Sequence, residues 1–140
     1  MFSIRCKYAI RSVLYLLTKQ GEKVSVKQIA ADLNITQPFL AKILQDLSRA
    51  KKISSVKGIR GGFYLADDQL DNRLIDIVVA IDGEDPLQEC VLGLEDCGSA
   101  NPCPLHEKAV IARGYYYEVL RNSKIKDLES VIKGKGLRLS

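Results

Sequence analysis

The stretch SVKQIAADLNITQPFLAKILQDLSRA, residues Ser25–Ala50, decides the fold. Apolar residues recur in it at helical spacing, which predicts a short helix over 26–33 and a longer one over 37–50. Thr36 is placed to cap the longer helix, and Pro38 is tolerated in that helix's first turn. A short helix, a three-residue turn and a longer helix with a polar outer face are typical of a helix-turn-helix.

Two short β-prone segments follow, at 53–56 and 63–65. The sequence between them, Lys57-Gly58-Ile59-Arg60-Gly61-Gly62, contains glycines that can adopt the positive φ angles a hairpin turn requires. A basic hairpin that directly follows a helix-turn-helix is a wing. We therefore predict a mainly α-helical fold with a small β-wing, in which residues 1–66 form a winged helix-turn-helix.

Basic and acidic residues are segregated along the chain, although the net charge is only +4. Residues 1–65 contain twelve Lys and Arg against three Asp and Glu, residues 66–107 contain one against eleven, and residues 108–140 contain eight against three. Such segregation indicates a polyanionic partner for the N-terminal half, and with the winged helix-turn-helix it predicts binding to double-stranded DNA. A solvated basic surface is the alternative interpretation of the charge alone.

Groove geometry predicts a task for each basic or polar side chain. The outer face and N-terminal end of the second helix would enter the major groove, where Gln37 and Lys42 can donate to base edges. Arg60, at the tip of the wing, would enter the narrower minor groove. The remaining candidates would contact phosphates: Thr36, Arg49, Lys51, Lys52 and Lys57.

Three of the four cysteines and the only histidine fall within the seventeen residues Cys90–His106, CVLGLEDCGSANPCPLH. Thiolate and imidazole donors suit zinc, copper(I) or an iron–sulfur cluster rather than calcium or magnesium. The Gly, Asn, Asp and Pro residues of this stretch allow it to fold back and bring the donors together. Residues 90–106 are thus predicted to form a metal- or cluster-binding loop; two buried thiols and an incidental pair are the alternative. The candidate ligands are Cys90, Cys97, Cys103 and His106.

The segments on either side of this loop are predicted to be helical. Residues 67–89 begin with an acidic turn and continue as a connecting helix over 74–81. A long helix is predicted from Pro104, which suits a first turn and would place Cys103 near a helix N-terminus. Residues 127–140 are predicted to form a short helix and a mobile basic tail.

The long helix, within residues 104–126, carries a heptad-like apolar stripe that suits a seam between two helices. We predict that this stripe is a dimer interface, because the helix also carries apolar residues on another side; an ordinary core helix is the alternative. The predicted interface residues are Leu105, Ala109, Ala112, Tyr116 and Val119.

Several classes of protein are disfavoured by what the sequence lacks. No apolar run approaches the roughly 20 residues that span a bilayer, and the N-terminus does not resemble a signal peptide. We therefore expect a cytoplasmic protein with no membrane partner, whose thiols are reduced and available as ligands. We expect no catalytic residues and no enzymatic activity, since the sequence shows no Gly-rich phosphate loop and no nucleophile motif.

Motifs along nearly the whole chain resemble one family, the IscR/NsrR-like bacterial winged helix-turn-helix regulators that sense iron–sulfur or redox status. They are Lys7-Tyr8-Ala9, Ile29-Ala30, Phe39-Leu40, Ser54-Ser55-Val56-Lys57-Gly58, Gly61-Gly62-Phe63-Tyr64-Leu65-Ala66 and the cysteine triad. The resemblance implies a homodimeric transcriptional regulator, a repressor, that binds a palindromic operator under the control of an iron–sulfur cluster.

The resemblance also implies a ligand set for that cluster. Cys90, Cys97 and Cys103 match the family's three cysteines, and His106 matches the fourth ligand of IscR-like members. NsrR-like members use an acidic residue from the partner's first helix, but the corresponding stretch here, Arg5-Cys6-Lys7-Tyr8, has no carboxylate.

Two departures and several alternatives remain at this point. A recognition-helix acid of IscR is Ala41 here, and a wing arginine is Lys57, so the operator sequence does not carry over. The cluster could be 2Fe–2S or 4Fe–4S. The same donors suit a structural zinc site, and a regulator with no cofactor that senses thiols or a metabolite is the further alternative.

Overall fold

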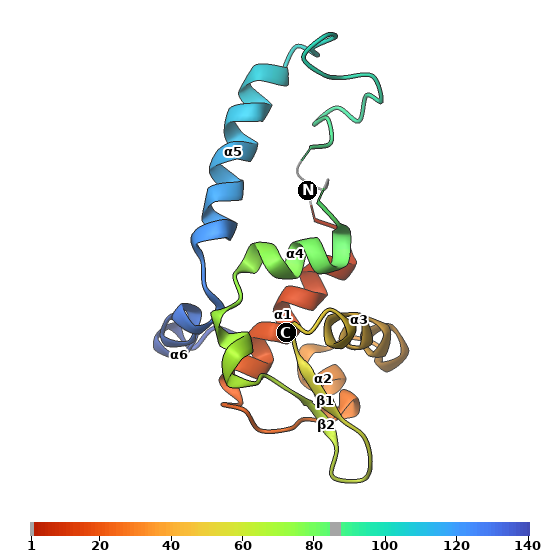
Figure 1. Ribbon diagram of the computed structural model, residues 1–140, viewed down its shortest axis with the longest axis vertical. Helices are drawn as coiled ribbons and strands as arrows, with labels where there is room; N and C mark the ends of the chain where they lie inside the picture. The colour runs from red at the N-terminus through yellow and green to blue at the C-terminus, as the bar shows by residue number, and fades with distance from the viewer. Residues whose placement is uncertain (1, 85–87) are drawn as a thin grey trace.

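The computed structural model describes residues 2–84 and 88–140 and confirms a mainly helical fold with a small two-stranded antiparallel sheet (Figure 1). The described segments are helices α1 (Ile4–Thr18), α2 (Val26–Leu33) and α3 (Gln37–Arg49), strands β1 (Ser54–Val56) and β2 (Gly62–Tyr64), the 3-10 turn η1 (Asp67–Asp71), helices α4 (Leu74–Asp82) and α5 (His106–Asn122), the 3-10 turn η2 (Ile125–Leu128) and helix α6 (Glu129–Lys135). No helix among these residues is long and apolar enough to cross a bilayer.

Helix α1 runs through the middle of the molecule and contacts α2, α3, α4 and α6. The predicted apolar stripe of α3, which is Leu40, Ile43, Leu44 and Leu47, is fully buried in the core that α3 shares with α1 and α2. Burying four large aliphatic side chains at about 1.5–3 kcal/mol each fixes the rotation of α3 about its axis. The opposite face of α3 is therefore left to the solvent.

The two helices of the helix-turn-helix begin in different ways. The Ser25 hydroxyl accepts a hydrogen bond from the backbone N–H of Gln28 at 3.2 Å and caps α2. Thr36 is the N-cap residue of α3, but its side chain makes no capping hydrogen bond. A capping oxygen accepts from the second or third N–H of a helix. Pro38 occupies the second position and has no N–H, so the predicted N-cap position of Thr36 is confirmed, but the Thr36 hydroxyl loses one of its two usual backbone donors.

The wing is a tightly built hairpin. Ser54, Ser55 and Val56 of β1 pair with Tyr64, Phe63 and Gly62 of β2. At the base of the hairpin, Val24 and Phe63 exchange two backbone hydrogen bonds of 2.9 and 2.8 Å. A Cβ atom on Gly62 would lie 2.6 Å from the Val24 carbonyl oxygen, and one on Gly61 would lie 2.0 Å from that of Val56. These glycines allow the close backbone approach that a side chain would prevent.

Helix α5 stands away from the winged head, and the cysteine loop lies at its far end (Figure 1). The other end of α5 is held by a small cluster in which Tyr116 and Leu120 pack with Cys6 and Val78. The helix begins at His106 rather than at Pro104, because the chain first makes a turn closed by the His106 N–H on the Cys103 carbonyl, 3.0 Å away. Cys103 accordingly lies before the first helical turn and not beside it.

The C-terminal segment differs from the prediction in two respects. The expected helix over 127–132 is the 3-10 turn η2 followed by α6. The tail is not free: Leu139 packs against the core, and the Arg11 guanidinium donates to the carbonyl oxygens of Leu139 and Leu33. Arg11 also lies over the Tyr8 ring, with its Cζ atom 5.1 Å from the ring centroid. This side chain therefore holds the tail onto α1.

Candidate cysteine site and DNA-binding surface

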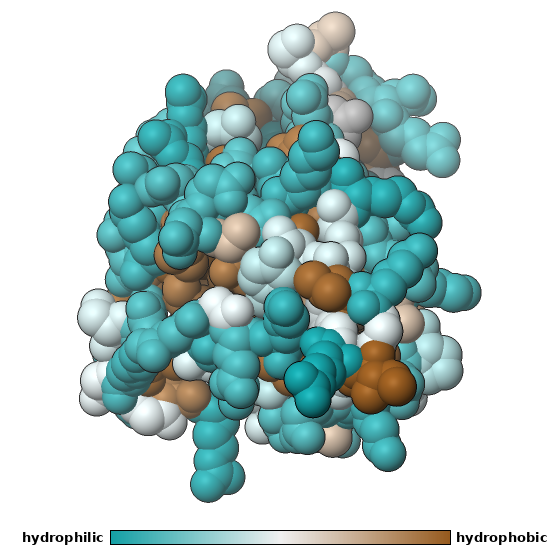
Figure 2. All heavy atoms as spheres, turned by 60° about the horizontal axis from the view of Figure 1, so that its bottom comes forward, coloured by the Kyte–Doolittle hydropathy of each residue, from teal (hydrophilic) through white to brown (hydrophobic). Residues whose placement is uncertain are grey.

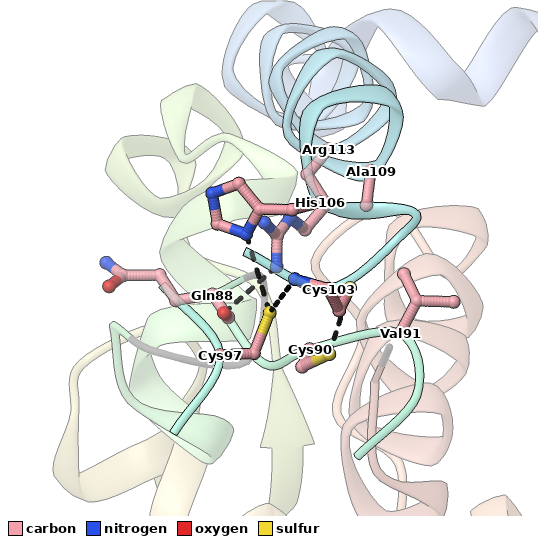
Figure 3. A pocket seen from close by; sticks show the side chains of 8 residues that line it. All are labelled: Gln88, Cys90, Val91, Cys97, Cys103, His106, Ala109 and Arg113. Atoms are coloured by element: carbon pink, nitrogen blue, oxygen red, sulfur yellow. Dashed lines mark hydrogen bonds between the residues drawn. The ribbon is translucent and has the colours of Figure 1, made fainter. Parts of the chain in front are cut away.

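The loop brings three thiols into one group at the start of α5. The sulfur atoms of Cys90, Cys97 and Cys103 all lie within 4.8 Å of one another. Cys90 Sγ and Cys103 Sγ are 3.7 Å apart, and His106 Nδ1 lies 3.5 Å from Cys97 Sγ (Figure 3). The three predicted cysteine ligands therefore form one group, and the fourth, His106, lies beside Cys97 but outside the set of atoms that are all within 4.8 Å of one another.

Backbone groups and one arginine hold this arrangement. The N–H of Cys103 donates to Cys97 Sγ at 3.4 Å. Arg113 reaches back from α5 and donates from Nη1 to the carbonyl oxygens of Gln88 and Glu89, at 2.9 and 2.7 Å (Figure 3). Arg113 was not among the predicted site residues. Its signal was its position seven residues after His106, which places both on one face of a helix.

The loop also shapes the electrostatics of the thiols. Backbone hydrogen bonds from Leu94 and Leu92 lower the pKa of Cys90 to about 7. At Cys97 the N–H of Cys103 favours the thiolate, but burial and the neighbouring thiols outweigh it and raise the pKa. The loop therefore favours the thiolate at Cys90 over that at Cys97, and a bound cation would favour the thiolate form of its ligands.

Two of the distances are those expected between the ligands of a metal centre. Around a tetrahedral ion with metal–sulfur bonds of about 2.3 Å, two sulfurs lie about 3.8 Å apart and a sulfur and a nitrogen about 3.5 Å apart. The Cys90–Cys103 and Cys97–His106 separations, 3.7 and 3.5 Å, match both values. Thiolates bound to different irons of a cluster stand farther apart, so the same donors would hold a cluster after the loop opens slightly.

Most of the predicted DNA-binding side chains are exposed to the solvent. Those of Thr36, Gln37, Lys42, Arg49, Lys51, Lys57 and Arg60 are exposed. Lys52 is only half-buried, and its Nζ lies 3.4 Å from the Asn72 side-chain oxygen. Arg49 pairs with Asp46, 3.2 Å away, and Asp46 also pairs with Arg5. The end of the molecule that carries the wing is predominantly hydrophilic, with small separate hydrophobic patches (Figure 2).

The predicted stripe of α5 divides between two faces. Ala109 is covered by the cysteine loop, and Tyr116 packs on Phe2 with ring centroids 5.5 Å apart. Leu105, Ala112 and Val119 are exposed. The exposed face also includes Ile111 and Tyr115, 74% and 77% exposed, which the heptad count did not include.

Comparison with known proteins identifies the family of this chain. The model of the Rrf2 family, described as an iron-dependent transcriptional regulator, matches residues 2–130. The chain belongs to the Rrf2 family. A putative HTH-type transcriptional regulator of Aquifex aeolicus (strain VF5) is 32% identical to this Rrf2 protein over 133 residues, which cover 94% of this chain and 92% of that protein.

Two further relatives bear on the resemblance seen in the sequence. The HTH-type transcriptional regulator NsrR of Shouchella clausii (strain KSM-K16) is 30% identical, over 86% of this chain and 83% of that one. The solved structure of CymR (YrzC), the global cysteine regulator of B. subtilis, superposes with a TM-score of 0.73 at 26% identity, covering 94% of this Rrf2 chain and 97% of CymR. These findings confirm the predicted family and the winged helix-turn-helix fold, and the relatives are transcriptional regulators rather than enzymes.

Proposed function

We propose that this Rrf2 protein is a cytoplasmic transcriptional repressor that binds a palindromic operator as a homodimer and that an iron–sulfur centre controls its binding. The observation that carries the proposal is the group of three sulfurs within 4.8 Å, with His106 beside it, at the start of the helix that bears an unpartnered apolar face.

The surface of the winged head supports the proposal for DNA. The exposed N-terminal end of α3 presents Gln37 and Lys42, and the wing presents Lys57 and Arg60. The first two suit base edges in the major groove, and the wing cations suit phosphates and the minor groove. Lys52 would contribute less than the others, because its ammonium group already faces Asn72.

The exposed face of α5 supports a dimer. A soluble protein rarely leaves several large apolar side chains together in water, and the face that includes Ile111 and Tyr115 does so over two turns of a helix. A two-fold axis beside α5 would pair this face with itself and hold two recognition helices at a fixed spacing. Leu105, Ala112 and Val119 would belong to the interface, whereas Ala109 and Tyr116 would support it from within each subunit.

The chain's own residues define how the centre would act. Cys90, Cys97 and Cys103 would bind iron as thiolates, and His106 would supply the fourth donor. When bound, the cluster supplies an oxidisable link between the loop and α5. Arg113 holds the residues just before the loop, Gln88 and Glu89, to α5 by two hydrogen bonds. Loss of the cluster would therefore release the cysteines from one another while the start of the loop stays attached to α5, and the contacts that the loop makes with α5 would change.

Anaerobic purification tests the proposal. We expect coloured protein with iron and sulfide in equal amounts, and an affinity for promoter DNA that falls steeply with salt. A Cys97→Ser variant should be colourless, whereas the matched Cys6→Ser variant should keep the colour. Colourless, iron-free wild-type protein would refute the cluster, and salt-independent or absent DNA binding would refute the operator function.

The distances favour a second candidate, a regulator with one zinc ion at the same site. A single tetrahedral ion would account for the 3.7 and 3.5 Å separations once His106 closes on the three sulfurs. In this case the ion would stabilise the loop against α5 and would not respond to oxidation. Stoichiometric zinc without sulfide in protein purified under the same conditions would establish this candidate over the cluster.

A third candidate, a thiol sensor without a cofactor, makes a different prediction about these cysteines. The Cys90 and Cys103 sulfurs lie 3.7 Å apart, so oxidation would join these two. Peptide mapping after mild oxidation of metal-free protein tests it: a Cys90–Cys103 disulfide with altered DNA affinity supports this candidate, and unchanged affinity excludes it.

A further inference from the structure

The tip of the wing combines a cation with a bare hydrophobic side chain. The Gly61 N–H donates to the Gly58 carbonyl oxygen at 3.0 Å, so Ile59 and Arg60 are the two central residues of a turn. The side chain of Ile59 is fully exposed, at 106% of its reference area, the highest value among the exposed large hydrophobic residues of the described chain. The wing lies at the bottom of Figure 1, opposite the cysteine loop.

The hairpin places this side chain on a rigid support. Its base is joined to Val24 by two backbone hydrogen bonds, and Gly61 and Gly62 pack directly against neighbouring backbone. Ile is β-branched and restricted at χ1. The Ile59 side chain therefore projects beyond the strands in a narrow range of directions and loses little conformational freedom on binding.

We propose that Ile59 is a specificity-determining residue that enters the minor groove of the operator as an apolar wedge beside Arg60. This inference rests on the proposed operator binding. Apolar side chains inserted from minor-groove binders part base steps, and pyrimidine–purine steps part most easily. The binding energy from Arg60 depends on the negative potential of the groove, whereas that from Ile59 depends on how easily neighbouring base pairs unstack.

This role has a signature that phosphate contacts do not share. Each cation that neutralises a phosphate adds about one unit to the dependence of binding on salt. Contact through an aliphatic side chain releases no counterions, so it leaves that dependence unchanged. Loss of Ile59 should weaken binding by the same factor at every salt concentration, while loss of Lys57 should flatten the salt dependence.

The test uses full-length protein and a duplex that the wild-type protein selects from a randomised pool. Derivatives of that duplex carry either a TA step or a stiff A-tract where hydroxyl-radical footprinting locates the wing. Affinities are measured over a salt series for wild type, Ile59→Ser, the size-conserving Ile59→Leu and the matched wing variant Lys57→Ser.

We expect Ile59→Ser to bind the TA duplex about tenfold more weakly with an unchanged salt slope, and to lose the preference for TA over the A-tract. Ile59→Leu should keep most of that preference, and Lys57→Ser should keep it while reducing the slope. Equal TA and A-tract affinities for wild type, or unchanged affinity in Ile59→Ser, would overturn the inference while leaving operator binding intact. Wild type that selects no duplex would refute the operator function itself.

Discussion

Substitution of Ile111 by Asp should separate the proposed dimer. Ile111 lies on the outer face of α5, is 74% exposed in the single chain, and neighbours Tyr115, 77% exposed. At a two-fold interface every substitution occurs twice, so a change at the centre of the face acts on both subunits. An Asp at this position would also leave two carboxylates close together and poorly solvated.

The size of the effect follows from the area involved. Full burial of an Ile side chain is worth about 2 kcal/mol, so covering the exposed three-quarters of Ile111 is worth roughly 1.5 kcal/mol per subunit. Two copies lose about 3 kcal/mol, which corresponds to a roughly hundredfold rise in the dimer dissociation constant. Burial of the introduced charges adds to this value, so a hundredfold change is the minimum expected.

Sedimentation equilibrium over a range of concentrations measures the dissociation constant directly. The matched control is Ile59→Asp, which introduces the same change at the far end of the molecule and should leave the dimer intact. Binding to duplexes with one or two half-sites completes the experiment: Ile111→Asp should lose the advantage of the second half-site. A folded Ile111→Asp protein that dimerises as wild type does would refute the assignment of this face.

Four other outcomes follow from particular contacts. Arg113→Ala should accelerate loss of bound metal to a chelator and proteolysis of the cysteine loop by roughly tenfold, because two hydrogen bonds to the loop are lost; Arg121→Ala, in the last turn of α5, is the control. Leu44→Ala should lower the free energy of unfolding in urea by about 2–5 kcal/mol, since the side chain is fully buried. Cys6 should react with an alkylating reagent only after unfolding, because burial raises its pKa to about 12. Cys97→Ser should leave the unfolding free energy of metal-free protein within about 1 kcal/mol of wild type, because Cys97 is only part-buried and its contacts with His106 and the Cys103 N–H are long, at 3.5 and 3.4 Å.

Local sequence signals predicted the head of the molecule well. Helix α2 has the predicted bounds, α3 ends one residue early, β1 begins one residue late, and β2 is displaced by one residue. Helical periodicity and glycine turns are properties of neighbouring residues, so they survive without knowledge of the rest of the fold. The buried stripe of α3 was predicted for the same reason.

Contacts between distant residues could not be predicted in this way. The heptad count placed Ala109 and Tyr116 on an outer seam, but the covering loop and Phe2 turn them inward. The basic tail was expected to be mobile because its own sequence has no apolar pattern that would predict packing. The tail is held in place by Arg11, more than a hundred residues earlier, which donates a hydrogen bond to the Leu139 carbonyl oxygen. Likewise, the spacing predicted that the cysteines form one site. The position of Arg113 relative to His106 indicates only that both lie on one helix face, because its partners, the carbonyl oxygens of Gln88 and Glu89, are backbone groups that any residue type would supply.

A continuous set of hydrogen bonds connects the helix of the cysteine site to the recognition helix. At the lower end of α5, the Leu74 N–H donates to the Ser123 carbonyl oxygen, and the Ile125 N–H donates to that of Asn72, at 3.0 and 2.9 Å. Asn72 also faces Lys52, the third residue beyond α3.

The wing is joined to the same point through one buried side chain. Gln69 is only 6% exposed; its amide donates to the Lys51 carbonyl oxygen, and its oxygen accepts from the Ser54 hydroxyl. Buried polar groups that are fully hydrogen-bonded resist displacement, because each broken bond leaves an unsatisfied group. A tilt of α5 would therefore move α3 and the wing together as one rigid head. Under the proposed control by the cysteine site, the variable that changes is the separation of two heads in the dimer, and the shape of each DNA-binding surface stays the same.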